Sequence, residues 1–429
     1  MAGTFHIRTF GCKLNQFDSA VVESDLRARG LVPSDSAGEA SVVVINTCTV
    51  THRADADARR LARRIRRENP DCFLVATGCL AERAPQELES LPEIDLVVRR
   101  GERARLGELV AARATHSGAL TGPGETPSCA GALSFGDRTR AFLKVQEGCA
   151  LRCSYCIIPE VRGPSVSVPP ELLATQLQRL IGAGYQEVVL TGVNTGDYGR
   201  DLEEPIDLAA LLRRLLDVPG LGRLRLNSLE PRTVTPEIID LLAADHRLAP
   251  HLQVPLQSGS DRVLARMRRN YRTEFYARTV EQIRHRVPHA GIGADVIVGH
   301  PGESDSDFRE TLQFIASSPL NYLHVFSYSP RPGTHSATQE GVVHDADITE
   351  RSARLRDLGD KLALRFRQSF VGKTLLTLAY DNRRKDGRLR ALTSNFIDLS
   401  LEAPDTSINT LLPARITSAT TTETLAIPA

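Results

Sequence analysis

The chain has 429 residues, of which 41% are hydrophobic and 24% charged, and its formal net charge at pH 7 is +1. This length and composition predict a globular protein of roughly two to four domains. No apolar run approaches the roughly 18 residues that a membrane helix needs, and the near-neutral charge excludes a polycation. Because the first residues also lack the features of a signal peptide, we expect a cytoplasmic protein with no membrane partner.

Residues 1–115 alternate short β-rich runs with helical stretches. The predicted strands are 5–10, 41–46, 73–78 and 94–98, and the predicted helices lie near 15–29, 52–68 and 84–90. This alternation predicts a small open α/β domain with a parallel sheet. Residues 116–138 are rich in Gly, Ser, Thr and Pro, and are predicted to be a linker.

Residues 139–368 repeat the strand-and-helix alternation on a longer scale. The predicted strands are 141–146, 187–192, 223–228, 251–256, 292–299 and 322–328, with helices such as 169–184 and 307–318 between them. Six such units are too few for a closed eightfold barrel, so we expect an open, partial barrel with six strands. Residues 369–429 alternate apolar and polar side chains, which predicts a small all-β module.

Three of the eight cysteines follow the first predicted barrel strand at a C-x3-C-x2-C spacing: Cys149, Cys153 and Cys156. Cysteines in a reducing compartment favour metal or redox roles over disulfides. Structural zinc usually takes four Cys or His ligands in pairs, and only Cys129 lies near enough to complete such a set. A four-iron cluster fits better, because three thiolates can bind three irons and leave the fourth open.

Three more cysteines each follow a predicted strand of the first domain: Cys12, Cys48 and Cys79. The carboxyl ends of parallel strands lie at one edge of a sheet, so these thiols can converge although they are distant in sequence. The alternative is that they are small buried side chains of the core. We predict a second metal cluster here, and expect Cys72 and Cys129 to be ordinary thiols.

The pattern around Cys149, with an aromatic Tyr155 before the last cysteine, resembles the signature of the radical S-adenosylmethionine (SAM) superfamily. The stretches 190–194, 227–231 and 294–303 resemble its further motifs. The resemblance implies that the open iron chelates SAM and that electron transfer cleaves SAM to a 5′-deoxyadenosyl radical. The residues implied to bind SAM are Tyr155, Thr191, Gly192, Asn194, Ser228, Glu230, Asp295 and Gly299.

The order of a three-cysteine sheet domain, a radical SAM barrel and a small β module resembles the methylthiotransferase family over nearly the whole chain. The last module resembles the RNA-binding TRAM type. The resemblance implies two 4Fe–4S clusters as cofactors, with one SAM methylating a sulfur and another generating the radical. It also implies a low-potential electron donor and a sulfur source as partners. We expect a monomer.

The family has classes that act on threonylcarbamoyladenosine in tRNA, on isopentenyladenosine in tRNA and on a ribosomal-protein aspartate. The stretches "LTGVNTG" and "RMRRNY" are most similar to the first class, the MtaB type. The expected substrate is therefore N6-threonylcarbamoyladenosine 37 in the tRNA anticodon loop, with isopentenyladenosine as the alternative and the aspartate less favoured. Two details depart from the family: His300 stands where Phe is usual, and residues 97–103 replace a commoner turn.

Basic residues gather in three places that could bind tRNA phosphates. They are Arg383, Arg384, Lys385, Arg388 and Arg390 in the last module, Arg63 and Arg67 in the first domain, and Arg268 and Arg269 after the fourth barrel strand. The alternative for each is a solvated surface. Two other functions stay open: a non-enzymatic iron–sulfur protein that binds RNA, and a zinc-dependent one. Neither needs the SAM motifs.

Overall fold

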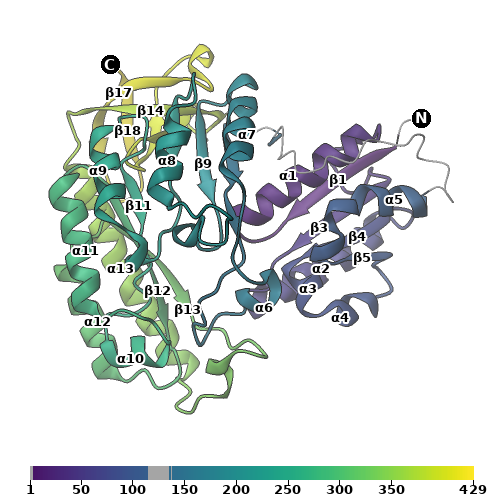
Figure 1. The fold of residues 1–429 in the computed structure, drawn as a ribbon, viewed down its shortest axis with the longest axis horizontal. Coiled ribbons are helices and arrows are strands. Elements are labelled where there is room, and N and C mark those ends of the chain that lie inside the picture. The colour runs from purple at the N-terminus through teal and green to yellow at the C-terminus, as the bar shows by residue number, and fades with distance from the viewer. Residues whose placement is uncertain (1–2, 115–134, 137) are drawn as a thin grey trace.

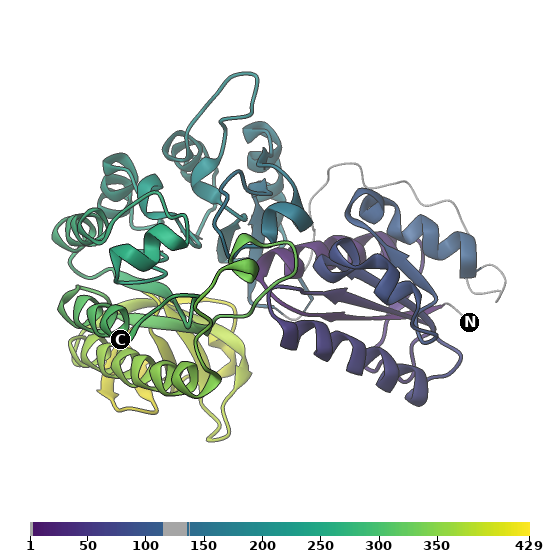
Figure 2. The ribbon, with the colours of Figure 1, turned by 90° about the horizontal axis from the view of Figure 1, so that it is seen from below.

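The computed structural model describes residues 3–114, 135–136 and 138–429. Nearly all of the predicted linker 116–138, with Cys129, lies outside the described residues. Figures 1 and 2 show an N-terminal α/β unit to one side of a central barrel, and Figure 1 shows the C-terminal strands at one end of that barrel. Within the described residues, no helix is long and apolar enough to cross a bilayer.

The N-terminal unit contains a parallel sheet with the strand order β2-β1-β3-β4-β5. The strands are β1 (Thr4–Thr9), β2 (Val32–Pro33), β3 (Val42–Thr47), β4 (Phe73–Gly78) and β5 (Leu96–Val98). All of β3 is buried, as is typical of a central strand with helices on both faces. The predicted open α/β fold is confirmed, and β2 is a short edge strand that the sequence pattern did not reveal.

Helices cover both faces of this sheet. They are α1 (Lys13–Ala28), α2 (His52–Glu68), α3 (Cys79–Arg83), α4 (Pro85–Glu89) and α5 (Leu106–Ala114). Val42 and Val44 of β3 pack against α1 and α5, whereas Val43 and Ile45 pack against α2. This follows from the period of two along a strand, which sends alternate side chains to opposite faces.

The central region is a six-stranded parallel barrel that stays open between its first and last strands. Its strands are β6 (Arg140–Lys144), β9 (Glu187–Thr191), β10 (Arg223–Arg225), β11 (His251–Gln253), β12 (Gly291–Val298) and β13 (Tyr322–Ser327). They form two three-stranded sheets, which isolated parallel bridges such as Ser228 to Gln253 connect. The predicted partial barrel is confirmed.

Helices lie on the outside of the barrel (Figure 2). They include α7 (Pro170–Gly182), α8 (Leu208–Leu216), α9 (Pro236–Ala244), α10 (Asp261–Arg266), α11 (Thr273–Arg286), α12 (Asp305–Ser317) and α13 (Asp345–Gln368). Two short strands, β7 (Gln146–Glu147) and β8 (Val166–Ser167), flank the short helix α6 (Ile158–Arg162). Both β10 and β11 end earlier than predicted, because the chain leaves the sheet in loops that carry polar residues of the site.

The C-terminal module is a closed barrel with the strand order β14-β15-β16-β18-β17. Its strands are β14 (Thr374–Arg383), β15 (Leu389–Thr393), β16 (Asp398–Leu401), β17 (Leu411–Ala419) and β18 (Thr424–Pro428). Closure leaves no unpaired strand edge. The predicted all-β module is confirmed.

Two buried arginines attach this module to the amino ends of the central strands. Arg223 donates to the carbonyl oxygens of Leu376 and Leu392, at 3.2 Å each. Arg225 donates to the carbonyl oxygens of Thr393 and Ser394, at 3.1 and 2.9 Å. The module is therefore part of the barrel's floor.

Glu187, at the start of β9, forms buried ion pairs with both guanidinium groups. Burial opposes ionisation of this carboxyl, but Arg223 and Arg225 hold its pKa well below the usual range. The single carboxylate thus compensates part of the charge of the arginines inside the protein, while their remaining donors reach the module.

Replacing Arg225 with Met should destabilise the protein, because Glu187 and two carbonyl groups lose a buried partner. We expect a loss of about 3 kcal/mol in unfolding free energy, seen as a lower denaturation midpoint. The matched control is Arg415→Met, since Arg415 is exposed on β17. Equal midpoints for the two variants would contradict the structural role of Arg225.

Candidate functional site

The loop Cys149–Cys156 lies after β7, at the carboxyl ends of the barrel strands. Gly148 begins it with φ +73°, and a Cβ there would collide with the Pro164 carbonyl oxygen, so only glycine fits. Ser154 fixes the loop from the other side: its N–H donates to the Met267 carbonyl (3.0 Å) and its hydroxyl to the Arg266 carbonyl (2.8 Å). The backbone positions of the three cysteines are therefore set by several elements.

His300, which replaces the expected Phe, belongs to this support. Its Nε2 lies 2.8 Å from the Ser336 hydroxyl, which donates to the Ser154 hydroxyl at 2.7 Å. The Ser336 N–H also donates to the Ser154 carbonyl at 2.7 Å. Burial lowers the pKa of His300 to about 4, so this imidazole is neutral near pH 7.

The thiols of the loop suit a metal cluster. Burial raises the pKa of Cys156 to about 12 and also raises that of Cys149, and backbone hydrogen bonds from Ile158 and Leu151 partly oppose these shifts. Such thiols stay protonated until a cation displaces the proton, and backbone N–H groups aimed at sulfur are typical of iron–sulfur ligands. All cysteines in the described part of the chain are free of disulfides.

Arg269 does not lie on the surface, where we expected it to contact RNA. Its side chain is only 6% exposed, and Nη1 lies 3.3 Å from the Cys153 sulfur. Its Nη2 lies 3.0 Å from Oε1 of Glu230, and its guanidinium stacks over the Tyr271 ring at 4.9 Å. The sequence run suggested a basic surface, but the chain turns inward after Arg268, which has φ +55°.

The cysteines of the second set lie near one another at the edge of the N-terminal sheet, and their role as cluster ligands stays a prediction. Cys12 caps α1, Cys48 follows β3, and Cys79 begins α3. A Cβ on Gly11 would lie 2.9 Å from the Cys48 sulfur, so the Cys12 turn passes directly beside Cys48. Burial above all, with a smaller contribution from the nearby Cys79 and Cys12, raises the pKa of Cys48 to about 11, although a backbone hydrogen bond from Val50 opposes the shift.

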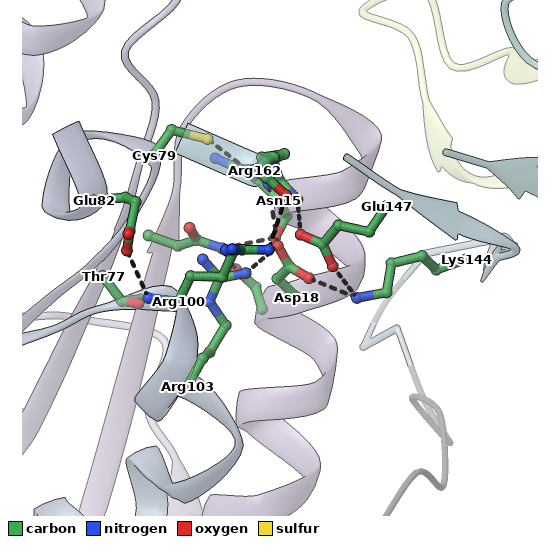
Figure 3. Close-up of polar contacts among 12 residues, drawn as sticks. Asn15, Asp18, Thr77, Cys79, Glu82, Arg100, Arg103, Lys144, Glu147 and Arg162 are labelled. Carbon is green, nitrogen blue, oxygen red and sulfur yellow. Dashed lines mark hydrogen bonds and ion pairs between the residues drawn. The ribbon is translucent and has the colours of Figure 1, made fainter. Parts of the chain in front are cut away.

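Asn15 and Arg162 join this cysteine set to the barrel (Figure 3). Asn15 Oδ1 accepts hydrogen bonds from the Cys79 thiol (3.9 Å) and from Arg162, while its Nδ2 donates to the Thr47 carbonyl at 2.9 Å. Arg162 comes from α6, which directly follows the Cys149–Cys156 loop, and it also pairs with Asp18 at 3.2 Å. One buried guanidinium thus contacts the surroundings of both sets.

A cavity of about 210 Å³ lies between the loop after Cys48 and the Cys149–Cys156 loop, and Cys156 is the one cysteine among its lining residues. Val50 and Thr51 line it from the Cys48 loop, and Tyr155 and Cys156 line it from the barrel loop. The remaining lining residues are Ile157, Ile158, Gln257, Asp295, Ile297, Phe326, Ser327, Tyr328 and Ser329. Its walls are mainly apolar and aromatic, with a few polar groups, so it can admit a flat base.

The residues predicted to bind SAM do not all face this region. Thr191 ends β9 and Gly192 follows it; the Thr191 hydroxyl is buried without a partner in the described structure. The Asn194 N–H donates to Gln146 Oε1 at 2.9 Å, and Asp295 accepts from Gln253 at 2.6 Å. Gly299 instead packs against Ile348 of α13, so the structure does not bring it to the cavity.

Ser228 and Glu230 lie in the loop after β10. The Ser228 carbonyl accepts from the Thr195 hydroxyl at 2.9 Å. Burial raises the pKa of Glu230, although Arg269 opposes this shift. Arg269 therefore connects Glu230 to Cys153, one of the thiols that would hold a cluster.

The basic residues predicted to bind RNA have mixed surroundings. In the C-terminal module, ion pairs engage Arg383 with Asp405, Arg384 and Arg390 with Asp398, and Arg388 with Asp386. Lys385, Arg67 and Arg268 are exposed, and Arg63 lies 3.9 Å from Glu93. These pairs reduce the charge available to phosphates, and RNA contact at these residues stays a prediction.

The sequence analysis missed three residues of this region: Lys13, Asn15 and Arg162. For Lys13 and Asn15 the sequence offers one hint, because in "GCKLN" they follow a cysteine at the start of a predicted helix. Their contact partners are distant in sequence, so this stretch does not reveal them. Burial and the Arg140 and Arg225 cations lower the pKa of Lys13 to about 8, which keeps it largely protonated near pH 7.

Comparisons with known proteins agree with this architecture. The radical SAM superfamily profile matches residues 143–315, and that of the uncharacterized family UPF0004 matches residues 4–99. The threonylcarbamoyladenosine tRNA methylthiotransferase MtaB of Bacillus subtilis is 35% identical, covering 97% of this chain and 94% of the relative. Its Thermotoga maritima counterpart is 36% identical, covering 88% and 86%.

A relative named for another substrate matches almost as well. The tRNA-2-methylthio-N(6)-dimethylallyladenosine synthase of Sphingopyxis alaskensis is 33% identical, covering 97% of this chain and 95% of that protein. The chain belongs to the radical SAM tRNA methylthiotransferase family. It is therefore an enzyme that modifies tRNA, and its cofactors, SAM and 4Fe–4S clusters, follow from the family.

Solved structures share the fold. A radical SAM methyltransferase from Kitasatospora setae, TsrM, solved with cobalamin and a 4Fe–4S cluster, has a TM-score of 0.55 at 19% identity, covering 79% of this chain and 77% of its own. The cobalamin-dependent radical SAM enzyme OxsB has a TM-score of 0.52 at 12% identity, covering 84% and 56%. At these identities the likeness shows the fold alone.

The arrangement of the thiols bears on the kind of metal group that fits. In the described ranges, no three His, Cys, Asp or Glu side chains meet closely enough to share one metal ion. A four-iron cluster sets a different requirement, because each thiolate binds a separate iron. The thiol donors and the backbone N–H groups near the sulfurs of Cys48, Cys149 and Cys156 fit such clusters.

Two triple variants test the assignment of the cysteines. After anaerobic reconstitution the protein should hold about eight irons, and replacing either Cys149, Cys153 and Cys156 or Cys12, Cys48 and Cys79 with Ala should leave about half. Iron analysis measures this. Replacing Cys72, which lies apart from both sets, serves as the control. Full iron content in a triple variant would show that its cysteines bind no cluster.

Arg269→Met should lower the reduction potential of the barrel cluster. The variant removes a charge-assisted N–H···S hydrogen bond to Cys153. The free energy of such a bond corresponds to a shift of about 60–130 mV in the reduction potential of a one-electron couple. A potentiometric titration followed by electron paramagnetic resonance measures it, with exposed Arg268→Met as the control. An unchanged potential would mean that Arg269 only supports the fold.

Proposed function

We propose that this enzyme converts N6-threonylcarbamoyladenosine 37 of tRNA to its 2-methylthio derivative. The observation that supports the proposal is the cavity lined by Cys156 on the barrel side and by Val50 and Thr51, which follow Cys48, on the other; a base bound there would lie near both cysteine sets. A C–H bond of the base is not acidic enough for a side-chain base near pH 7, so the reaction needs a radical route. When bound, SAM and the clusters supply the radical, the sulfur and the methyl group.

The chain's own residues hold and shield the reacting groups. Tyr155, Ile157 and Phe326 offer apolar walls for the adenine. Arg269 and Glu230 are positioned beside Cys153, where the amino acid part of SAM would bind. Asn15 and Arg162 hold the N-terminal set beside the same cavity.

Two considerations support threonylcarbamoyladenosine over isopentenyladenosine. The relatives described above that carry the MtaB name are 35% and 36% identical, against 33% for the dimethylallyladenosine synthase. This difference is small. The stronger support is the charged interior of the barrel, which fits a substituent with a carboxylate better than a hydrocarbon.

The partners follow from the same chemistry. A low-potential electron donor must reduce the barrel cluster, and a sulfur source must replenish the atom that is transferred. We propose that the protein acts as a monomer in the cytoplasm. The exposed Lys385, Arg67 and Arg268 are the first candidates for phosphate contacts with the anticodon stem.

Cells that lack this protein should accumulate threonylcarbamoyladenosine without its methylthio group. Mass spectrometry of tRNA nucleosides measures this, and re-expression of the wild-type gene, but not of the Cys149 triple variant, should restore the product. If isopentenyladenosine were the nucleoside left unthiolated, the substrate proposal would be wrong. If the cells instead lost methylthio-aspartate from a ribosomal protein, the substrate would be that protein and not tRNA.

A further inference from the structure

A lysine from the N-terminal unit reaches into the interior of the barrel. Lys13 is the first residue of α1, directly after Cys12, and its Nζ lies 2.6 Å from Oδ1 of Asn227 in the loop after β10. Its side chain is thus directed away from its own sheet and toward the barrel strands. A lysine in this position needs a reason, because burying an ammonium group is costly.

The surroundings of Lys13 carry more positive than negative charge. The nearby cations are Arg140 and Arg225, and the nearby carboxylate is Glu187. This carboxylate is already shared by Arg140, Arg223 and Arg225. Asp295, on β12, is engaged by Gln253 and His324. Four cations therefore share one carboxylate at this end of the interior.

Lys13 and Asn227 also have free hydrogen-bonding capacity. An ammonium group has three donors, and in the described part of the structure Asn227 is the only hydrogen-bond partner of Lys13. Asn227 accepts this bond through its side-chain oxygen, which leaves its amide N–H groups to donate. A charged and a neutral donor side by side, next to excess positive charge, suit a carboxylate ligand.

We propose that Lys13 and Asn227 bind the carboxylate of the threonylcarbamoyl group and so select this substrate. The inference rests on the proposed function and adds the residues that read the substituent. Lys13 adjoins Cys12 of one set, and Asn227 precedes Ser228 and Glu230 beside the other. Neither residue lines the cavity itself, so the threonylcarbamoyl group would extend beyond the cavity to meet this pair.

The proposed pair would select against the isopentenyl group, the alternative substituent. An isopentenyl group carries no charge, so its entry would leave the ammonium group desolvated and without a counter-ion. Sites built to hydrogen-bond a substrate group reject analogues that lack it far more strongly than apolar pockets reject small size differences. Lys13 would then determine specificity without taking part in the radical chemistry.

The test combines a variant with a change in the substrate. Lys13→Gln keeps a donor of similar reach but removes the charge. Wild type and variant are reconstituted and assayed on two tRNA anticodon stem-loops, one with threonylcarbamoyladenosine and one whose threonine carboxylate is a carboxamide. With the carboxylate substrate, the variant should lose about 10- to 100-fold in kcat/KM. With the carboxamide, wild type and variant should react at similar rates.

Controls separate this role from others. The exposed Lys361→Gln should behave as wild type, and Lys13→Arg should recover part of the preference for the carboxylate. Iron content and the dissociation constant of SAM, which also has a carboxylate, should stay unchanged in Lys13→Gln.

Three outcomes would overturn the inference. An equal loss on both stem-loops would make Lys13 a structural support of the Cys12 turn. Weaker SAM binding with an unchanged substrate preference would assign the carboxylate to SAM. A wild-type enzyme that prefers the carboxylate, with a variant that does so equally, would leave Lys13 without a part in recognition. If wild type acted on isopentenyladenosine instead, the proposed function itself would fail, which is a distinguishable result.

Discussion

The site depends on a buried guanidinium that holds the N-terminal sheet against the barrel. Arg162 is 2% exposed and pairs with Asp18 and Glu147 at 3.2 and 2.9 Å, besides its bond to Asn15. Burial disfavours ionisation of Asp18, but Arg103, Lys144 and Arg162 together lower its pKa to about 2. Because such a network is costly to break, the sheet and the barrel keep one arrangement.

A second buried arginine fixes the other side of the same interface. Arg331, after β13, binds Asp55 of α2 and donates to the Thr49 hydroxyl at 2.9 Å, next to Cys48. Ile157 and Val161 pack on Cys79 between these two anchors. The interface therefore sets where each cysteine set lies relative to the other, and the cavity is its consequence. A chemistry that joins a radical and a sulfur atom on one base requires such fixed placement.

The sequence predicted those features that local pattern determines. Strand periodicity located the six barrel strands, and the position of Cys12, Cys48 and Cys79 after strands predicted their convergence. The sequence did not predict which residues the long Arg and Lys side chains contact. Arg268 and Arg269 are neighbours in one basic run, yet only Arg269 is buried against Cys153, because the backbone turns between them. The contacts of Lys13 and Arg162 span 214 and 147 residues to Asn227 and Asn15, and no local pattern reports such distances.

The central claim is that the two cysteine sets hold clusters on either side of one cavity. Pulsed electron paramagnetic resonance of the reduced, reconstituted protein tests it most directly. We predict a magnetic interaction between two clusters that disappears in each triple cysteine variant. A wild-type spectrum equal to the sum of the two variant spectra would contradict the claim, because it would place the clusters too far apart to act on one base.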